Sequence, residues 1–480
     1  MSTVLVRIAV FVAAAAVLVL EIVAGRILAP YVGVSLQTFT GIIGTILAAI
    51  ALGAWIGGRA ADRYDPDRLL GPVLIVGGVL AVVSPAVVYV VGPNATSEGP
   101  LTIIALAAIG FFLPAAVLST VTPIAAKASL SSLESTGVVV GQLSALGTAG
   151  ALFGTFVTGF VLIASMPSQP ITWFVGAVLV LLGSALSWSG MRTAVVVGVL
   201  ALSFAVVGAS AIAAPCDHET AYSCAIITGP NDAPTVKALI LDTFVNSVVD
   251  TEDPAWLSSR YARAMDAVVA SRVDGSFNGL YVGGGGFAMP RYYEATRGSS
   301  ATVLEIDPAL PPIAFDELGL VDGPWLTIVT GDARVGLRSA AGPFEVIVGD
   351  AFSGRSVPWH LTTKEFISQL DEVLTPDGVY AINVIAHPPN EFVRAELVTL
   401  ASVFDHVVLV SPQRQLDGGR GGNYILAGSR TPFDGDRIAN LVTDGEVVLV
   451  DAEALDWARG GLVLIDEFAP TDQLLSRPQP

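Results

Sequence analysis

Apolar stretches of about 20 residues fill the first 215 positions of this 480-residue chain and do not recur after them. Each stretch is long enough for a helix that crosses the hydrocarbon core of a bilayer. The pattern predicts about seven such segments, at roughly 4–24, 39–59, 70–92, 101–121, 137–164, 171–189 and 193–214. Residues 1–215 are therefore expected to form an α-helical domain of a multi-pass membrane protein, with the lipid bilayer as its partner.

The two parts of the chain differ in charge as sharply as in hydropathy. Residues 1–215 carry 7 basic and 6 acidic side chains, whereas residues 216–480 carry 17 basic and 36 acidic ones. The second part is thus an acidic soluble domain, large enough for one sizeable hydrophobic core. Its charge repels nucleic acid, so no nucleic-acid partner is expected, and it favours a cationic partner.

Basic residues in short loops indicate which side of a membrane each loop faces. With seven spans, most of the basic residues of the first part fall on the N-terminal side: Arg7, Arg59, Arg63, Arg68, Lys127 and Arg192. This bias favours a cell membrane of bacterial type, with the N-terminus in the cytoplasm and the soluble domain outside.

Two short patterns bear on how the membrane part is built. Gly150, Gly154 and Thr158 recur at four-residue spacing, which indicates a seam where two helices pack closely. Cys216 and Cys224, the only cysteines, follow the last predicted span. Such a pair is compatible with a disulfide in an oxidising compartment, and two buried free thiols are the alternative.

The second part alternates short apolar runs with helical stretches. Strands are predicted at GLYVGGGG, ATVLEIDP, LTIVTGDAR, EVIVGDAF and VYAINVI, helices at PRYYEATRG and TTKEFISQLDEVL, and a turn at TPDG. This order is typical of a parallel sheet covered by helices on both faces. The runs SCAIITG and VKALILDTFVNSVVD alternate more strictly and predict a small antiparallel β-subdomain. The expected division is 1–215 (membrane helices), 216–270 (β-subdomain and connecting helix) and 271–480 (α/β domain with a polar tail).

A glycine turn follows the first strand of this sheet. Gly283, Gly284 and Gly285 would let the backbone approach a ligand at the carboxyl ends of the strands. Glu305 ends the neighbouring strand, where one carboxylate can accept hydrogen bonds from both ribose hydroxyls. Asp332 follows the third strand, and the set predicts a nucleoside site. The histidines have no ligand-like spacing, so no metal is expected.

The segments YVGGGGFAMPRYYEA, VLEIDP, VTGDAR, FEVIVGDAF, LTTKEF and LTPDGVYAINV resemble the spermidine synthase family, the polyamine aminopropyltransferases, across roughly residues 216–430. The patterns LEIVAGRILAPYVG and ALGAWIGGRAADR are similar to membrane-fused members of that family. The resemblance implies a Rossmann-like domain of the S-adenosylmethionine-methyltransferase type, and a homo-oligomer. It also implies transfer of an aminopropyl group from decarboxylated S-adenosylmethionine to an amine.

Carried over position by position, the resemblance assigns roles to several residues. It implies that Glu305 binds the donor's ribose, and that Asp332 and the backbone of Ala333 meet the adenine amino group. Asp350 aligns with the acid that takes a proton from the attacking amine, because an ammonium cannot attack carbon. The nucleoside is then a co-substrate, so no tightly bound cofactor is expected.

The chain also departs from the family pattern on the amine side. Gly286 stands where an acid usually contacts the donor's amino group, and Ser353 stands where a second acid usually holds the diamine. A looser alignment places Ser223 at a usual Gln and Ala262 at a usual His. Losing one charged hydrogen bond costs on the order of 1.5–3 kcal/mol. Four nearby acids are candidates to substitute: Asp242, Asp250, Glu252 and Asp253.

Two tyrosines and three functions remain open at this point. Tyr222 and Tyr261 are candidates to line an amine channel, with core tyrosines as the alternative. The leading hypothesis is a membrane-anchored aminopropyltransferase with Asp350 as base. A non-catalytic nucleoside sensor coupled to the membrane helices is the second, favoured by the missing acids. The third is methyl transfer from intact S-adenosylmethionine, because the same sheet hosts that chemistry.

Overall fold

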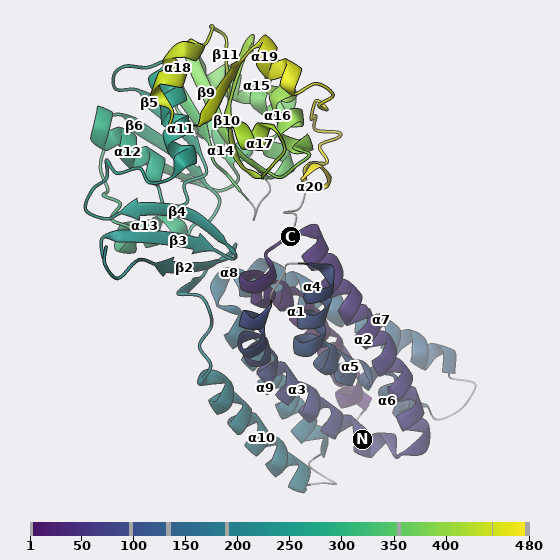
Figure 1. Cartoon of the computed structure of the whole chain (residues 1–480). Helices are drawn as coiled ribbons and strands as arrows, with labels where there is room; N and C mark the ends of the chain where they lie inside the picture. Colours follow the sequence, from purple (N-terminus) through teal and green to yellow (C-terminus); the bar gives the residue numbers. More distant parts are fainter. Residues whose placement is uncertain are drawn as a thin grey trace. The chain divides into compact units, whose positions relative to one another are not determined.

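A computed structural model describes residues 3–95, 99–130, 136–187, 192–352, 357–443 and 445–475 of the chain. These residues form two compact units (Figure 1). The first comprises residues 1–226 with 241–243, and the second comprises residues 227–240 with 244–480. Ser353, one of the predicted substrate contacts, lies outside the described residues.

The first unit is helical. Its elements are α1 (Thr3–Val32), α2 (Leu36–Arg63), α3 (Pro66–Val91), α4 (Pro100–Ala107), α5 (Leu113–Ser119), α6 (Val121–Ser129), α7 (Thr136–Val157), α8 (Ile163–Ser165), α9 (Ser168–Ser187) and α10 (Arg192–Ser210). π-Helical turns at Ala108–Phe112 and Thr158–Leu162 join α4 to α5 and α7 to α8. By length and composition alone, six helical segments of the described residues could cross a membrane, and α10 contributes a shorter apolar helix. Six of the seven predicted segments thus match helices that could span, and the seventh coincides with α10.

The close seam between helices lies where the small residues predict it. A Cβ atom on Gly150 would lie 2.2 Å from the carbonyl oxygen of Phe11, and one on Gly154 would lie 2.4 Å from that of Ala15. Glycine therefore allows the backbones of α1 and α7 to touch at these two positions. Thr158, one turn further on, is fully buried.

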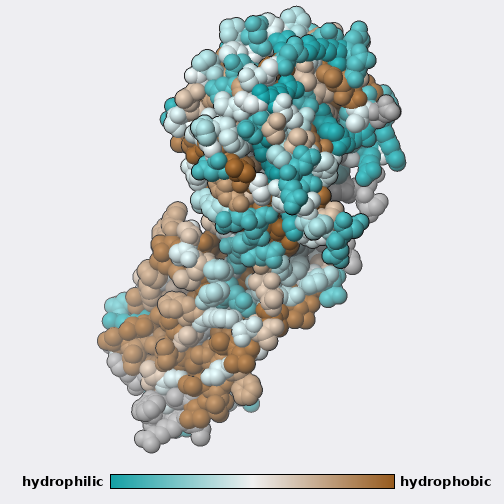
Figure 2. All heavy atoms as spheres, turned by 90° about the vertical axis from the view of Figure 1, so that its left-hand side faces the viewer, coloured by the Kyte–Doolittle hydropathy of each residue, from teal (hydrophilic) through white to brown (hydrophobic). Residues whose placement is uncertain are grey.

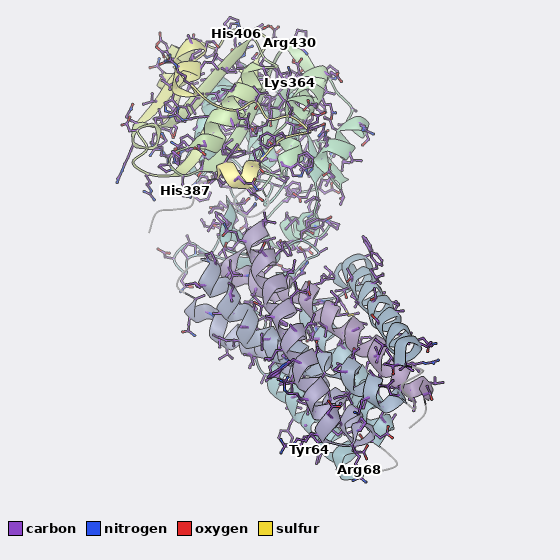
Figure 3. The ribbon with its side chains drawn as sticks, turned by 90° about the vertical axis from the view of Figure 1, so that its right-hand side faces the viewer. Tyr64, Arg68, Lys364, His387, His406 and Arg430 are labelled. Carbon is purple, nitrogen blue, oxygen red and sulfur yellow. A yellow bond between two sulfur atoms is a disulfide. The ribbon has the colours of Figure 1, made fainter. Side chains whose placement is uncertain are left out.

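Much of the surface of the helical unit is apolar. Brown, hydrophobic spheres cover a large part of its visible face in Figure 2, whereas teal and white prevail on the second unit. Exposed large side chains lie along α2, α7 and the π-helical turn after α7: Leu36, Phe39, Ile43, Leu47, Trp55, Leu152, Phe153, Phe156 and Phe160. Tyr64 and Arg68, at the α2–α3 junction, lie together at one end of the unit (Figure 3). An apolar flank with polar groups at its end is what a bilayer-embedded bundle requires.

A short disulfide-closed segment packs on this unit. Cys216 and Cys224 form a disulfide, so the alternative of two free thiols is wrong. Arg26 of α1 donates hydrogen bonds to backbone carbonyls of the enclosed segment and lies 3.4 Å from the Glu219 carboxylate. That carboxylate also accepts a hydrogen bond from the backbone nitrogen of Ser168, at the start of α9. The segment is therefore tied to two helices.

Two sheets follow. The smaller has four strands in the order β1 (His218–Glu219), β2 (Cys224–Thr228), β3 (Val236–Leu241) and β4 (Phe244–Asp250). The larger has eight strands in the order β12-β10-β11-β9-β8-β5-β6-β7. Their bounds are β5 (Asn278–Val282), β6 (Ser300–Glu305), β7 (Leu326–Thr330), β8 (Phe344–Gly349), β9 (Leu374–Ala386), β10 (His406–Pro412), β11 (Gly422–Ser429) and β12 (Glu446–Val450).

Helices complete the α/β domain, and most of them contact strands of the large sheet (Figure 1). They are α11 (Arg260–Ala270), α12 (Ala288–Arg297), α13 (Leu310–Glu317), α14 (Ala333–Gly336), α15 (Lys364–Val373), α16 (Glu391–Ala401), α17 (Gln413–Leu416), α18 (Gly435–Leu441), α19 (Ala452–Trp457) and α20 (Thr471–Leu474). The strands β5, β6 and β8 are almost wholly buried, as expected for strands covered on both faces. The α/β prediction is confirmed.

Two details of the sheet differ from the prediction. Parallel pairing joins the neighbours β7, β6, β5, β8 and β9. In contrast, β11 pairs antiparallel with β9, β10 with β11, and β12 with β10. Residues 413–421, between β10 and β11, are too few for a parallel crossover, which takes about a dozen residues or more. The predicted TPDG turn is instead part of β9, where the pairing with β8 steps from Leu374 to Val379 across an irregularity.

Candidate active site

The glycine turn lies between β5 and α12. Gly283 and Gly285 have φ values of +95° and +50°, a region that disfavours side chains. A Cβ atom on Gly283 would lie 2.7 Å from the carbonyl oxygen of Asp350, and one on Gly285 would lie 2.2 Å from the Asn246 Oδ1 atom. Both positions thus favour glycine for backbone conformation, and Gly283 also needs it for space because its close neighbour is backbone.

Glu305, at the end of β6, is bound to this turn. Its Oε2 atom accepts hydrogen bonds from the backbone nitrogens of Gly284 (2.8 Å) and Gly285 (3.1 Å), and its Oε1 atom accepts one from Asp307 (2.9 Å). Burial raises the pKa of Glu305, while these three donors oppose the rise. A carboxylate has about four lone-pair positions. In this conformation Glu305 therefore has one position left for a ribose hydroxyl, and the sequence-based expectation of two would require the turn to rearrange.

Asp332 follows β7 and begins α14. Its Oδ1 atom accepts a hydrogen bond from the backbone nitrogen of Val335, and its Oδ2 atom lies 2.7 Å from the Nε2 atom of His360. Ala333, the other predicted adenine contact, is 7% exposed. His360 carries no local signal for the site, because 28 residues separate it from Asp332 and only the fold brings them together.

Asp350 directly follows β8, next to the glycine turn in the sheet. Its Oδ2 atom accepts a hydrogen bond from the Tyr261 hydroxyl at 3.1 Å, and its Oδ1 atom accepts one from the Asn383 Nδ2 atom at 2.9 Å. The residue keeps some accessible surface, but enough protein surrounds the carboxyl group that burial raises its pKa from 3.8 to about 6. The two hydrogen bonds oppose that rise. Of the two tyrosine candidates, the structure brings Tyr261 to Asp350; Tyr222 belongs to the other compact unit and is 52% exposed.

Gly286 is flanked by neutral groups that sequence reasoning missed. The backbone nitrogen of Gly286 donates to the Ser247 Oγ atom at 3.0 Å, and that hydroxyl donates to Asn246. A polar pair from β4 therefore stands beside the position of the usual acid. The spacing along β4 gave no signal, because neither residue matches a family position that the sequence analysis used.

Three of the four acids proposed as substitutes have local roles. Asp242 accepts a hydrogen bond from the backbone nitrogen of Cys224. Asp250 accepts hydrogen bonds from the backbone nitrogens of Glu252 and Asp253, and Asp253 accepts one from Ala255. Glu252 is exposed. These contacts shape turns, and none of them involves Asp350.

Cavities do not by themselves mark the site. A surface pocket of about 600 Å³ is lined by residues such as Asp274, Asp434 and Arg437. None of the predicted site residues lines it. A cavity of about 10 Å³ is lined by Gly349, Ala351 and Asn383, next to Asp350. It has room for about one water molecule. The clustering of side chains, rather than hollow volume, therefore identifies the site.

These features define an α/β domain of the S-adenosylmethionine-methyltransferase type, with acids at the ends of adjoining strands. Sequence similarity to known proteins points to the same class. The chain is 25% identical over 213 residues to a polyamine aminopropyltransferase of Vibrio vulnificus, covering 41% of this chain and 69% of that protein. It is also 33% identical over 138 residues to an N-terminal histidine N-methyltransferase of Emericella nidulans, covering 28% and 24% of the two chains. No protein-family model matches the chain.

A solved structure supports the fold. The crystal structure of a probable spermidine synthase from Corynebacterium glutamicum matches with a TM-score of 0.50 and 24% identity, covering 54% of this chain and 98% of that one. The resemblance of the second unit to spermidine synthases is thus confirmed, and the comparisons support a transferase enzyme. They do not cover the whole chain.

Proposed function

We propose that this chain is a membrane-anchored aminopropyltransferase that uses decarboxylated S-adenosylmethionine and an amine acceptor, with Asp350 as the base. One observation carries the proposal: a buried carboxylate, held by two neutral donors, lies at the carboxyl edge of the sheet beside the glycine turn. A base with a pKa near 6 is ionised at neutral pH and still accepts a proton readily.

The reaction that fits this arrangement is a single displacement. The acceptor's nitrogen forms a bond to the aminopropyl carbon attached to the sulfonium, and the carbon–sulfur bond breaks. Its electron pair stays on sulfur, so methylthioadenosine leaves as a neutral thioether. The proton of the attacking amine passes to Asp350. Because the sulfonium is already a good leaving group, the protein mainly orients the reactants.

The donor would lie along the ends of β5, β6 and β7. We assign the ribose to Glu305 and the adenine amino group to Asp332 with the Ala333 backbone. The glycines Gly283–Gly285 would let the backbone approach the donor closely. The acids and the turn fit an adenosyl group because the turn provides a small-residue surface and the acids provide acceptors. Tyr261 would contact the amine, and Ser353 is assigned to the amine from the sequence alone.

Methyl transfer is a second candidate. The similarity to a histidine N-methyltransferase favours it, because that class uses the same sheet with intact S-adenosylmethionine. A non-catalytic nucleoside sensor is the third. Gly286, which stands at the position of an acid that contacts the donor's amino group, favours the sensor.

A product assay separates the three functions. The purified full-length chain in detergent would be incubated with several amines and either decarboxylated or intact S-adenosylmethionine. Mass spectrometry would then look for methylthioadenosine with an aminopropylated amine, or for S-adenosylhomocysteine with a methylated product. The proposal expects the first pair. The second pair would replace it with methyl transfer, and absence of both with intact nucleoside binding would leave the sensor.

A further inference from the structure

A chain of two asparagine amides extends from Asp350 into the sheet. The Asn383 Nδ2 atom donates to Asp350, and the Asn423 Nδ2 atom donates to the Asn383 Oδ1 atom, both at 2.9 Å. Asn383 is 2% exposed, and Asn423 is partly buried. We propose that Asn423 is a positioning residue that fixes the orientation of the Asn383 amide and thereby keeps Asp350 an ionised base; this inference rests on the proposed function.

The strand register accounts for the contact between the two amides. In the antiparallel pair of β9 and β11, Asn383 lies opposite Ile425, and Asn423 lies opposite Ile385. Residues directly opposite, and residues two apart on one strand, share a face of the sheet. Both amides therefore project from the same face as diagonal neighbours. In the parallel pair of β8 and β9, Gly349 lies opposite Ile382, which puts Asp350 beside Asn383.

Hydrogen-bond chemistry determines which groups donate and which accept along the series Asp350, Asn383 and Asn423. An ionised carboxylate only accepts, so Asn383 must turn its NH₂ group to Asp350 and its oxygen to Asn423. Asn423 must then donate in turn. If Asn383 flipped, its oxygen would face Asp350 and would favour the protonated acid, which can donate. While the Asn423 NH₂ group faces Asn383, a flip of Asn383 would set two NH₂ groups against each other, so this arrangement favours the charged form of a carboxylate that burial disfavours.

Few other titratable groups face this chain in the described residues. Tyr261 on α11 donates to Asp350, and Tyr380 on β9 lines the adjoining small cavity. Burial raises the pKa of both tyrosines well above the usual value, so both stay neutral through the acid range. His360 pairs with Asp332, and His387 packs beside Gly421, two positions before Asn423. Only His387 therefore needs a control.

Two substitutions test the direction of the chain. Asn423→Leu removes the donor, and Asn423→Asp replaces it with a carboxylate, which only accepts hydrogen bonds and adds a second negative charge near Asp350. We expect the acid limb of kcat/KM for methylthioadenosine release to move to higher pH, with Asn423→Asp shifted further than Asn423→Leu. At pH 6 the loss should be about tenfold or more, and most activity should return by pH 8.5. His387→Gln should leave the pH dependence of kcat/KM on the acid side unchanged.

A second readout does not depend on turnover. A hydrophobic carbodiimide adds to protonated carboxyl groups, so labelling of the peptide that contains Asp350 can be followed against pH by mass spectrometry in the full-length chain. Both Asn423 variants should extend labelling to higher pH than the wild type. If activity falls equally at every pH and labelling is unchanged, Asn423 is merely structural and the inference is wrong. If the wild type releases no methylthioadenosine, the proposed function fails, and the labelling result still decides the role of Asn423.

Discussion

At the scale of single residues, the pKa of Asp350 sets how the reaction should depend on pH. Burial raises this pKa to about 6, and the base must be ionised to take a proton. We therefore expect kcat/KM to fall about tenfold for each pH unit below 6 and to level off above it. A steady-state pH profile measures this. A limb near pH 4 would mean that the carboxyl group is not desolvated during catalysis.

Removing the charge of Asp350 should separate catalysis from binding. Asp350→Asn keeps the shape of the side chain but cannot accept a proton, so we expect a loss of turnover of about 10²–10⁴-fold. Affinity for methylthioadenosine, measured by calorimetry, should stay within about threefold of the wild type. Retained turnover in this variant would exclude Asp350 as the base.

The same substitution should stabilise the protein at neutral pH. Because the pKa is higher in the folded state than its ordinary value of 3.8, the folded state binds the proton more tightly. The stability that protonation contributes is present below pH 4 and is lost as pH rises through 6. Above pH 6, Asp350→Asn should gain at most roughly 3 kcal/mol in unfolding free energy, less where water screens the group. Denaturant unfolding of both proteins at pH 4 and pH 8 measures the difference, which should appear only at pH 8.

Glu305 is expected to matter for the nucleoside rather than for the chemical step. Glu305→Gln keeps the size of the side chain but replaces one acceptor oxygen by an NH₂ group, so the side chain can no longer accept from the turn amides, the Asp307 nitrogen and a ribose hydroxyl together. One lost charged hydrogen bond predicts nucleoside binding roughly 10- to 100-fold weaker. Glu453→Gln, at an exposed position on α19, is the matched control and should bind normally. Equal affinity in all three proteins would remove Glu305 from the site.

At the scale of elements, the α1–α7 seam gives a test of the helical unit. Gly150→Ala would place a Cβ atom against the Phe11 carbonyl oxygen, so we expect a loss of about 1–3 kcal/mol from overpacking. Gly141 lies on the same helix with no atom within 4 Å of the added Cβ. Gly141→Ala should therefore be neutral or slightly stabilising, because alanine favours helix. Thermal unfolding of the detergent-solubilised full chain compares the two; equal losses would mean that the seam does not form.

The elements also show what a single sequence can and cannot predict. The helices, the parallel strands β5 to β8 and the positions of Glu305, Asp332 and Asp350 at strand ends follow from hydrophobic periodicity and turn residues, which are local signals. The antiparallel strands after β9 were missed because strand direction depends on non-local pairing. His360, Asn383 and Asn423 were missed for the same reason, since each reaches the site only through the fold and carries no motif. The part of the site that sequence reasoning found is the part that local spacing encodes.

At the scale of the whole molecule, the asymmetric charge and the disulfide make a prediction about sidedness. The basic-loop bias favours a cytoplasmic N-terminus, and the Cys216–Cys224 disulfide is of a kind that persists in oxidising compartments. With α10 as a seventh span, the C-terminus lies opposite the N-terminus, so we expect an alkaline phosphatase reporter fused there to be active in bacteria and a green fluorescent protein fusion to be dark. The opposite pattern would place the second unit in the cytoplasm.

The central claim is that the second unit holds an adenosyl group between the glycine turn, Glu305 and Asp332, within reach of Asp350. Calorimetry of the purified full-length chain with decarboxylated S-adenosylmethionine, intact S-adenosylmethionine and methylthioadenosine tests it most directly. The account predicts one binding site per chain for the decarboxylated donor and for methylthioadenosine. If none of the three nucleosides binds to the folded protein, the claim is wrong.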